Sequence, residues 1–316
     1  MKKKNQPLVC IVIVNWNGGE KINNCLKSLK KTKYPNYKVV VLDNGSSDDS
    51  IKTIKKFKEV FLLKGKENLG FTGGSNLLYQ FVIKRFNPDY VCNMNNDIVT
   101  VQQDWLSLMV KELEKEEKRG ICGNKLVFPD GRVQQLFWDR QPKEYNEKDN
   151  GQYNFVREVS AVGGANILIK RSVLEIIGGT DENYFYGPDD IDYCFRAKEK
   201  GFKIVYTGLS KSVHVGSFSY KSSSKDFIYK HQSYGMILFS FRHEKFPKAM
   251  KMVFNQFVRI FLTRKDPFRS KEISNFYFHK TVIIRTFYFF NSLVLAIKNY
   301  QNVKIGDYSY LENETV

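Results

Sequence analysis

Short apolar runs alternate with longer amphipathic segments between residues 8 and 128. The runs are rich in Val and Ile, as is typical of buried strands, whereas the longer segments repeat their apolar positions at helical spacing. Such alternation favours an α/β fold in which a parallel sheet carries helices on both faces. The predicted strands are 8–15, 38–42, 60–63, 90–94 and 121–128, and the predicted helices are 20–31, 48–58, 74–85 and 102–118.

Polar residues follow each of the first four predicted strands. The four stretches are "NWN", "DNGSSD", "ENLGFTGGSN" and "NND". Because the carboxyl ends of parallel strands meet at one edge of a sheet, we expect these loops to line a crevice for a polar ligand. Taken alone, "NND" also suits a tight turn, since Asn and Asp are common turn residues. The convergence of four such loops favours a binding site.

The third of these loops has the clearest features of a phosphate site. Gly70, Gly73 and Gly74 allow the backbone to approach a ligand closely. Ser75 and Asn76 are expected to begin a helix whose free amides face a phosphate. The loop matches neither GxGxxG nor the Walker pattern, which argues against a dehydrogenase and a P-loop enzyme.

Composition limits the class of protein. The chain has 316 residues, of which 42% are hydrophobic, and this is enough for a substantial core. The formal net charge of +17 indicates an anionic partner, which could be nucleic acid, acidic lipid or a phosphorylated small molecule. Five cysteines without a CxxC pair indicate neither a zinc cluster nor a disulfide framework and suit a reducing cytoplasm. The apolar run near the start is too short for a signal peptide and is interpreted as the first strand.

Three acidic residues, Asp189, Asp190 and Asp192, stand at the start of a predicted helix. Acids in a first turn stabilise the helix dipole, and Asp192 can pair with Arg196 one turn later. Capping needs fewer than three carboxylates, however. Two adjacent carboxylates raise the pKa of one of them, and this suits a general base.

His214 lies in the apolar alternation "VHVG". A single histidine in such a setting is commonly a packing residue. If Asp97 of "NND" carries a divalent cation, however, the site needs further ligands, and His214 is the only histidine before the C-terminal segment. Both interpretations remain open from the residues alone.

Several segments, in order, resemble the signatures of the inverting family 2 glycosyltransferases of the GT-A fold, especially the rhamnosyltransferase-like branch. The segments are "VIVNWN", the aspartate of "VLDNGSSDDS", "ENLGFTGGSN", "NNDI", "VGGANILIKRSV", "GGTDENYFYGPDDIDYCFRAKEKGFKIVY" and "VHVGSFS". The resemblance implies a Rossmann-like nucleotide-binding sheet with helices on both faces. It places a catalytic domain at 1–219, with a nucleotide half at about 1–128 and an acceptor half at about 129–219. The family's DXD motif falls at Asn95-Asn96-Asp97, which keeps only the last carboxylate, and its Glu-Asp motif falls at Asp189-Asp190.

The resemblance also implies a role for each matching residue. Asp190 would be the base that takes a proton from an acceptor hydroxyl, with Asp189 beside it, in a single displacement that inverts the anomeric carbon. Asp97 would ligate Mg²⁺ or Mn²⁺, with His214 as a second protein ligand. The donor would be a UDP- or dTDP-sugar, with rhamnose suggested by the branch, and the acceptor a glycan or a lipid-linked glycan. The residues expected to bind the nucleotide sugar are Val14, Asn15, Asn17, Asp43, Asn68, Gly70, Gly73, Asn76, Asn95, Asn96 and Gly164.

The C-terminal segment, 220–316, is predicted to form basic, aromatic helices. Between residues 217 and 301 there are 15 Lys or Arg and 4 Asp or Glu, which give a net charge of +11. The same range contains 20 aromatic residues. Its apolar runs are interrupted by arginines, and none reaches the roughly 20 residues that span a bilayer. Such helices either pack on the catalytic domain or lie on an anionic membrane surface. The second interpretation predicts a cytoplasmic protein at the inner face of the cell membrane, acting in cell-surface polysaccharide synthesis.

Two other classes of function stay open on sequence. A basic, aromatic protein can bind single-stranded nucleic acid, but this explains only the C-terminal segment, and no RNP or helix-turn-helix pattern is present. No nucleic-acid partner is therefore expected. The incomplete DXD motif also allows a catalytically silent, membrane-associated assembly partner.

Overall fold

The computed structural model describes residues 6–135, 137, 147–185, 187–215, 225–261 and 275–308. The chain divides into two units. The sheet unit comprises Met1–Thr180, Tyr193–Gly216 and Ile305–Val316, and the helical unit comprises Asp181–Asp192 and Ser217–Lys304. The predicted boundary at residue 219 lies outside the described residues. The acidic motif belongs to the helical unit, whereas the sequence prediction had placed it in the catalytic domain.

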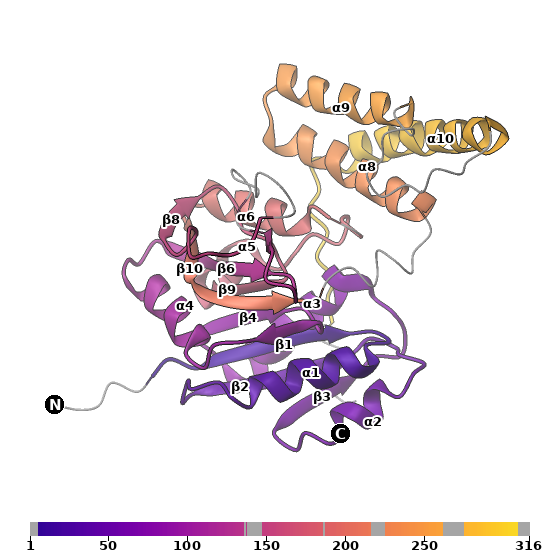
Figure 1. Ribbon diagram of the computed structural model, residues 1–316. Coiled ribbons are helices and arrows are strands. Elements are labelled where there is room, and N and C mark those ends of the chain that lie inside the picture. The colour runs from indigo at the N-terminus through magenta and orange to yellow at the C-terminus, as the bar shows by residue number, and fades with distance from the viewer. Residues whose placement is uncertain are drawn as a thin grey trace. The chain divides into compact units, whose positions relative to one another are not determined.

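A sheet of ten strands forms the centre of the sheet unit in the described residues (Figure 1). The strand order is β3-β2-β1-β4-β9-β6-β10-β5, with β7 beside β6 and β8 beside β10. The strands are β1 (Val9–Asn15), β2 (Tyr37–Asp43), β3 (Val60–Lys64), β4 (Tyr90–Met94), β5 (Ile98–Thr100), β6 (Arg119–Val127), β7 (Val133–Gln135), β8 (Val156–Val159), β9 (Asn166–Lys170) and β10 (Lys203–His214). The helices are α1 (Gly19–Leu29), α2 (Ser50–Ile54), α3 (Gly70–Phe86), α4 (Trp105–Glu114) and α5 (Arg171–Ile177), while α6 (Asp189–Glu199) begins in the helical unit and ends in the sheet unit.

The first four strands pair in parallel, as the alternating pattern predicts. Strand β1 pairs with β2 on one side and with β4 on the other, and β3 pairs with β2. The sequence analysis assigned no strand at β9, which runs antiparallel to both β4 and β6. Apolar periodicity shows that a strand is buried but not its direction. The reversal brings the loop before β9 to the carboxyl end of β4, where the Asn95 amide donates to the Ala165 carbonyl at 2.9 Å.

Alternate residues of β1 face two different layers of helices. Val9, Ile11 and Ile13 are fully buried in a core that α1 and α4 complete. On the other face α3 packs close to the sheet because Gly74 has no side chain. A Cβ there would lie 2.9 Å from Val14 Cγ1. Gly74 therefore serves helix–sheet packing, not the close approach to a ligand that we expected of it.

Helix α3 begins four residues before its predicted start. Gly70 has a φ of 73°, a left-handed conformation that glycine adopts easily, and it opens the helix. Ser75 and Asn76 consequently lie inside the helix, where their amides take part in its ladder. The expectation that these two residues begin the helix is wrong. Residues 70–73 form its first turn, and the Gly70 amide donates to Asn68 Oδ1. Helices α2 and α4 are shorter than predicted.

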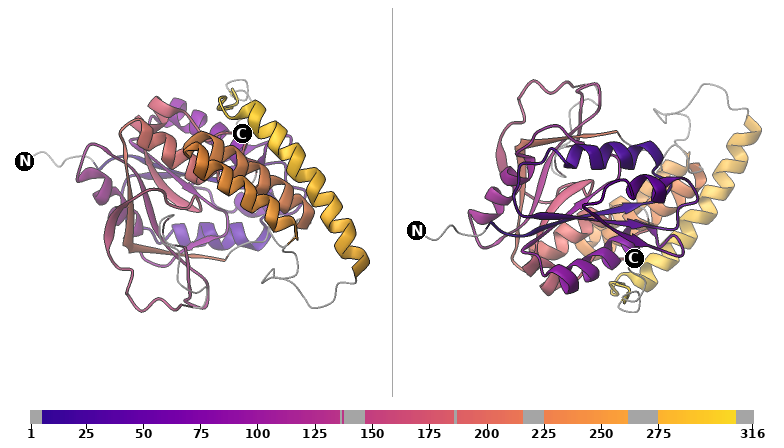
Figure 2. Two further views of the ribbon diagram at one scale, coloured as in Figure 1. Left: turned by 90° about the horizontal axis from the view of Figure 1, so that it is seen from above. Right: turned by 90° about the horizontal axis from the view of Figure 1, so that it is seen from below.

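Three long helices make up most of the helical unit, which confirms the helical character predicted for the C-terminal segment (Figure 2). They pack on one another through fully buried residues such as Leu238 and Ala296, and the rings of Phe257 and Phe289 lie 5.3 Å apart. Across the described ranges, no helix is both long and apolar enough to cross a membrane. The helices are α8 (Lys225–His243), α9 (Phe246–Phe261) and α10 (Asn275–Asn299).

Candidate functional site

A chain of side-chain hydrogen bonds joins the carboxyl ends of β2, β1 and β4. Asn15 Nδ2 donates to Asp43 Oδ1 at 3.1 Å, and Asn96 Nδ2 donates to Asn15 Oδ1 at 2.9 Å. The Ser46 amide donates to the second Asp43 oxygen at 3.1 Å. Asn15 and Asp43 are buried. The loops after these three strands therefore converge, as their polar character predicts.

The turn after β1 depends on a glycine that the sequence analysis did not select. Asn17 has a φ of 47°, and its amide donates to Ser46 Oγ at 2.9 Å. A Cβ on the next residue, Gly18, would lie 2.0 Å from Asn15 Oδ1 and 2.7 Å from Asn96 Nδ2. Only glycine at position 18 leaves room for the hydrogen bond between these two amides. Gly18 directly follows the stretch "NWN", but the atoms around it are known only from the fold.

The third strand-end loop is anchored by a second asparagine pair. Asn68 Oδ1 accepts hydrogen bonds from the Gly70 amide at 2.9 Å and from Asn44 Nδ2 at 3.0 Å. Asn44 also donates to the Gly70 carbonyl and accepts from the Leu69 amide. These bonds hold the backbone at the start of α3. The sequence analysis missed Asn44, although its position directly after Asp43 was a usable signal.

Asn76 has a structural contact that the sequence does not predict. It is 1% exposed, and its amide bonds both backbone groups of Thr180, donating to the carbonyl at 2.8 Å and accepting from the amide at 2.8 Å. Gly179 allows this contact, because a Cβ there would lie 2.0 Å from Asn76 Oδ1. Val14 and Gly73, also predicted to bind the donor, are buried as well. Asn76 thus joins α3 to the segment that precedes the acidic motif.

Strands β5 and β10 bring Asp97 and His214 together. His214 pairs with Ile98 in the ladder, and the Val215 amide donates to the Asp97 carbonyl at 3.1 Å. His214 Nε2 lies 3.1 Å from Asp97 Oδ1. Burial raises the pKa of Asp97, but the hydrogen bond and charge of His214, together with Lys21, outweigh burial and hold that pKa below its ordinary value. Asp97 is therefore ionised at neutral pH.

A glutamine fixes the other side of the imidazole. His214 Nδ1 lies 2.8 Å from Gln134 Oε1 on β7. If Nδ1 donates to that oxygen, Nε2 can present a lone pair to a cation that Asp97 also ligates. The sequence analysis missed Gln134, because nothing in the apolar pattern marks so short a strand as β7.

The Asp97–His214 pair fits a divalent cation. Neighbouring ligands at about 2.1 Å in an octahedral site are about 3.0 Å apart, close to the separation of these two atoms. Within the described residues, no group of three or more His, Cys, Asp or Glu side chains could hold a metal. The remaining ligands would have to come from a bound phosphate or from water.

Asn95 presents an unused acceptor beside this pair. Its side-chain oxygen is buried and has no hydrogen-bond partner in the part of the chain that the structure describes. A buried acceptor without a partner costs roughly 1–3 kcal/mol, so a ligand hydroxyl that donates to it would be favoured. The Asn95 amide donates to the carbonyl of Ala165, and this contact brings Asn95 near the backbone that contains Gly164.

The acidic motif contains two adjacent carboxylates, and the pKa of one of them is raised. Burial, followed by the charges of Asp190 and Asp192, raises the pKa of Asp189 to about 8. Asp189 therefore favours its protonated form at neutral pH. Asp190 Oδ1 accepts a hydrogen bond from the Ile191 amide at 2.9 Å. The raised pKa that adjacent carboxylates predict is found here.

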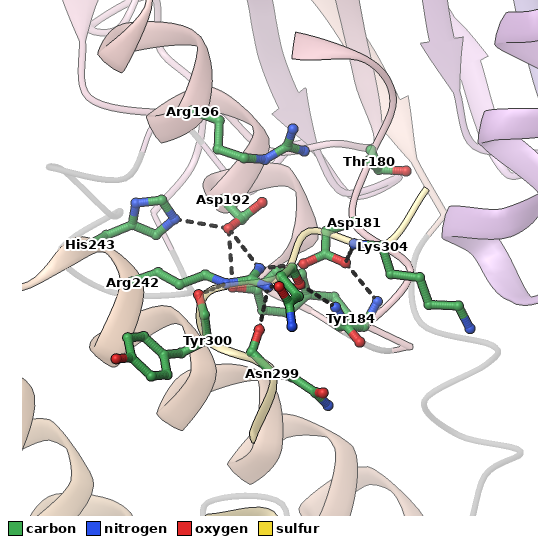
Figure 3. A network of polar contacts seen from close by, with 12 residues as sticks. Thr180, Asp181, Tyr184, Asp192, Arg196, Arg242, His243, Asn299, Tyr300 and Lys304 are labelled. Carbon is green, nitrogen blue, oxygen red and sulfur yellow. Dashed lines mark hydrogen bonds and ion pairs between the residues drawn. The ribbon is translucent and has the colours of Figure 1, made fainter. Parts of the chain in front are cut away.

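The third acid, Asp192, has polar partners far away in the sequence. It is fully buried and accepts hydrogen bonds from Tyr184 Oη at 3.1 Å and from His243 Nε2 at 2.8 Å (Figure 3). Arg196, its expected partner, donates to the carbonyls of Ile177 and Gly179.

A mixed sheet with nucleotide-type loops at its strand ends defines the GT-A class of glycosyltransferase fold, and solved structures of such enzymes resemble this chain. A Pyrobaculum calidifontis mannosyltransferase in complex with GDP-Man and Mn²⁺ has a TM-score of 0.56 at 15% identity, covering 93% of this chain and 74% of that one. S. aureus TarS 1-349 in complex with UDP-GlcNAc has a TM-score of 0.56 at 13% identity, covering 95% and 97%. A family model described as glycosyl transferase family 2 matches residues 10–178, more than half of the chain. The chain belongs to this family.

Curated relatives are 22–26% identical to the chain over the residues that align. The O-antigen biosynthesis protein RfbC of Myxococcus xanthus is 23% identical over 236 residues, which are 70% of this chain and 18% of the relative. An N-acetylglucosaminyl-diphospho-decaprenol L-rhamnosyltransferase of Mycobacterium tuberculosis is 23% identical over 269 residues, or 76% and 86%. The chain thus spans less than a fifth of the length of the first relative.

Proposed function

We propose that this chain transfers a sugar from a nucleotide diphosphate to a hydroxyl of a glycan or lipid-linked acceptor, with inversion, in the synthesis of a cell-surface polysaccharide. The observation that carries the proposal is the hydrogen-bonded chain Asp43–Asn15–Asn96 beside the Asp97–His214 pair. These side chains offer hydrogen-bond acceptors for the nucleobase and the sugar. The neighbouring Asp97 carboxylate is suited to hold the metal that binds a diphosphate. Rhamnose, from a UDP or dTDP donor, is the sugar suggested by the signature segments and by the name of the M. tuberculosis relative.

In the proposed reaction, Asp190 accepts the proton of the acceptor hydroxyl. The hydroxyl oxygen bonds to the anomeric carbon while the bond from that carbon to the diphosphate oxygen breaks, so the configuration inverts. Asp97 and His214 would hold Mg²⁺ or Mn²⁺, which supplies charge for the leaving diphosphate. Asn15, Asn17 and Asp43 would bind the nucleoside.

The other predicted residues contribute to the same site in this proposal. Asn68, Gly70 and the first amides of α3 would face the diphosphate. Asn95, Asn96 and Gly164 would contact the sugar or ribose. Val14, Gly73 and Asn76 would act by shaping the pocket, since they are buried.

A donor screen tests the proposal. Nucleotide sugars with UDP, dTDP and GDP are added with Mn²⁺, and the shift in melting temperature is measured, because a ligand that binds only the native state stabilises it. One donor class should stabilise the protein and release nucleoside diphosphate when acceptor is added. If a donor binds but no nucleoside diphosphate is released with any acceptor, the result would favour a catalytically silent assembly partner. Salt-sensitive binding of oligonucleotides in place of any donor would favour the nucleic-acid alternative.

Replacing Gly18 by Ala is expected to weaken nucleotide binding by roughly 10-fold or more, because overpacking of about 1–3 kcal/mol displaces Asn15. The affinity for UDP and dTDP is measured by calorimetry. Gly19→Ala is the comparison. Its Cβ would approach only Asp48 Oδ2, at 3.6 Å, so it tests the strain of a left-handed φ of 48° without a clash, whereas Gly18 has a φ of −80° and only the clash acts there. Wild-type affinity in Gly18→Ala would remove the Asn15–Asn96 contact from the nucleotide site.

We further propose that the helical unit binds an anionic membrane surface. Large apolar side chains are exposed along α9, and a stripe at helical spacing is exposed along α10. Lysines flank the apolar residues of α9, as anionic lipid would require. The exposed apolar residues are Phe246, Met250 and Phe254 on α9, and Ile283, Phe287, Phe290, Val294, Leu295 and Ile297 on α10.

The double variant Phe246→Ser and Phe254→Ser should bind anionic vesicles at least about 10-fold more weakly, since each buried Phe contributes roughly 1.5–3 kcal/mol. Flotation with phosphatidylglycerol vesicles measures the loss. Ile176→Ser is a matched control, because Ile176 is 57% exposed in the sheet unit. These substitutions are sharper than deletion of residues 217–316, since Gly306 and Tyr308 bond Gln80 of the sheet unit. Equal flotation of the double variant and the control would refute the membrane surface.

A further inference from the structure

Arg242, at the end of α8, is the centre of a buried polar network in the helical unit (Figure 3). Its side chain is 6% exposed. Its guanidinium donates to Asp181 and lies 3.6 Å from Asp192 Oδ1. The same group donates to three carbonyls at the end of α10 and just beyond it. These are Tyr300 at 2.9 Å, Asn299 at 3.0 Å and Asn302 at 2.7 Å.

The carboxylates on which Arg242 acts are themselves held from several sides. Asp181 Oδ1 accepts hydrogen bonds from the amides of Asn183 and Lys304, both at 2.9 Å. Asp192 receives Tyr184 Oη and His243 Nε2, and Figure 3 shows these groups directed toward its carboxylate. Both acids are 0% exposed. A buried carboxylate without such partners is strongly disfavoured, so the network determines the position of the segment between the two acids.

That segment carries the acidic motif. Residues 181–185 lead into the first turn of α6, where Asp189 and Asp190 stand within three residues of Asp192. Asp192 is part of the same helical turn, so the contacts that fix its carboxylate also restrain the backbone that carries Asp189 and Asp190. Transfer of a proton to a base is sensitive to displacements of about 1 Å.

We infer that Arg242 and His243 of α8 are positioning residues for the base of the proposed transfer reaction, acting through Asp181 and Asp192. This inference rests on the proposed function. It gives the C-terminal helices a part in holding the acidic motif of their own unit, in addition to the proposed membrane contact. The acidic motif alone would then be insufficient for transfer without α8 and the end of α10.

Three substitutions in the full-length chain test the inference. Arg242→Lys keeps the charge but cannot make five contacts at once. His243→Phe keeps an aromatic ring beside Phe239, since the ring centroids of His243 and Phe239 lie 4.9 Å apart. It removes the Nε2 group that donates a hydrogen bond to Asp192. His243→Gln restores a donor at nearly the same position. Lys248→Gln is the control, because it removes a positive charge from a largely exposed side chain of the same unit.

Hydrogen exchange and kinetics give separate readouts. In Arg242→Lys and His243→Phe, amides of residues 183–192 should exchange at least 10-fold faster than in the wild type, and those of β1 should not change. With the donor found in the screen, kcat should fall at least 10-fold while KM for that donor stays within 2-fold. His243→Gln should recover most of both losses, and Lys248→Gln should match the wild type.

Unchanged exchange, or a wild-type kcat in both variants, overturns the inference. If Arg242→Lys does not fold, His243→Phe and its rescue by His243→Gln decide the question. A loss in His243→Phe that His243→Gln does not recover also overturns the role assigned to the hydrogen bond. A wild-type protein that turns over no donor overturns the proposed function instead, and the exchange result still decides whether the network orders the acidic motif.

Discussion

Asp190→Asn is expected to bind donor and metal as the wild type does, yet to transfer sugar roughly 10²- to 10⁴-fold more slowly, as is typical when acid–base catalysis is lost. The amide is nearly isosteric with the carboxylate and can still accept the hydrogen bond from the Ile191 amide. It cannot take up the acceptor's proton. Initial rates of nucleoside diphosphate release, with binding measured in parallel, separate the two effects.

Asp189→Asn and Asp192→Asn provide the comparison. Because the raised pKa keeps Asp189 protonated at neutral pH, a neutral amide there imitates the wild-type state and should leave transfer within a few-fold. The pKa of Asp189 is higher in the folded than in the unfolded state, so this group lowers the free energy of unfolding as pH rises toward about 8. The Asp189→Asn variant should not show this contribution to the decrease. If Asp190→Asn is active and Asp189→Asn is not, the base is Asp189. If all three variants are active, the acids only stabilise the helix dipole.

Asp97→Ala is expected to abolish metal-dependent binding of the donor. Asp97 is the one carboxylate of the "NND" motif, it is ionised, and it faces His214 at 3.1 Å. Its loss would remove the main negative charge from the cation site. Titration with Mn²⁺ and UDP, followed by calorimetry, measures the effect, and metal-independent UDP binding should persist at lower affinity.

His214→Ala gives the graded counterpart of this experiment. It should weaken the apparent affinity for Mn²⁺ while leaving the protein folded, because only one of two protein ligands is removed. Gln134→Ala should weaken it less, since Gln134 only orients the imidazole. Turnover and metal dependence that survive Asp97→Ala unchanged would refute the assignment of the cation site. A His214→Ala variant with lower stability and normal metal titration would make His214 a packing residue.

The local features of the nucleotide half were predictable from the sequence because they follow from short-range patterns. The apolar run of β1 is fully buried as its Val and Ile content predicts, and β4 has the predicted bounds. Parallel pairing of β1 with β2 and β4 follows from the alternation with helices, and it brings Asn15, Asp43 and Asn96 to one edge of the sheet. The family resemblance likewise rests on contiguous segments, and the match to residues 10–178 agrees with it.

Contacts between distant segments were decided only by the tertiary structure. The antiparallel pairing of β9 with β4, the Gln134–His214 contact and the contact of Asn76 with Thr180 each join residues 72 to 104 positions apart, and no periodicity encodes such pairs. The same holds for Asp181 and Asp192, which appear in the sequence as ordinary acids. Their partner Arg242 follows 61 residues after Asp181 and 50 residues after Asp192, in a segment that composition marks only as basic and aromatic. The sequence determines which side chains are available, whereas burial in a particular fold determines which charges must find each other, because an unpaired buried charge is too costly to keep.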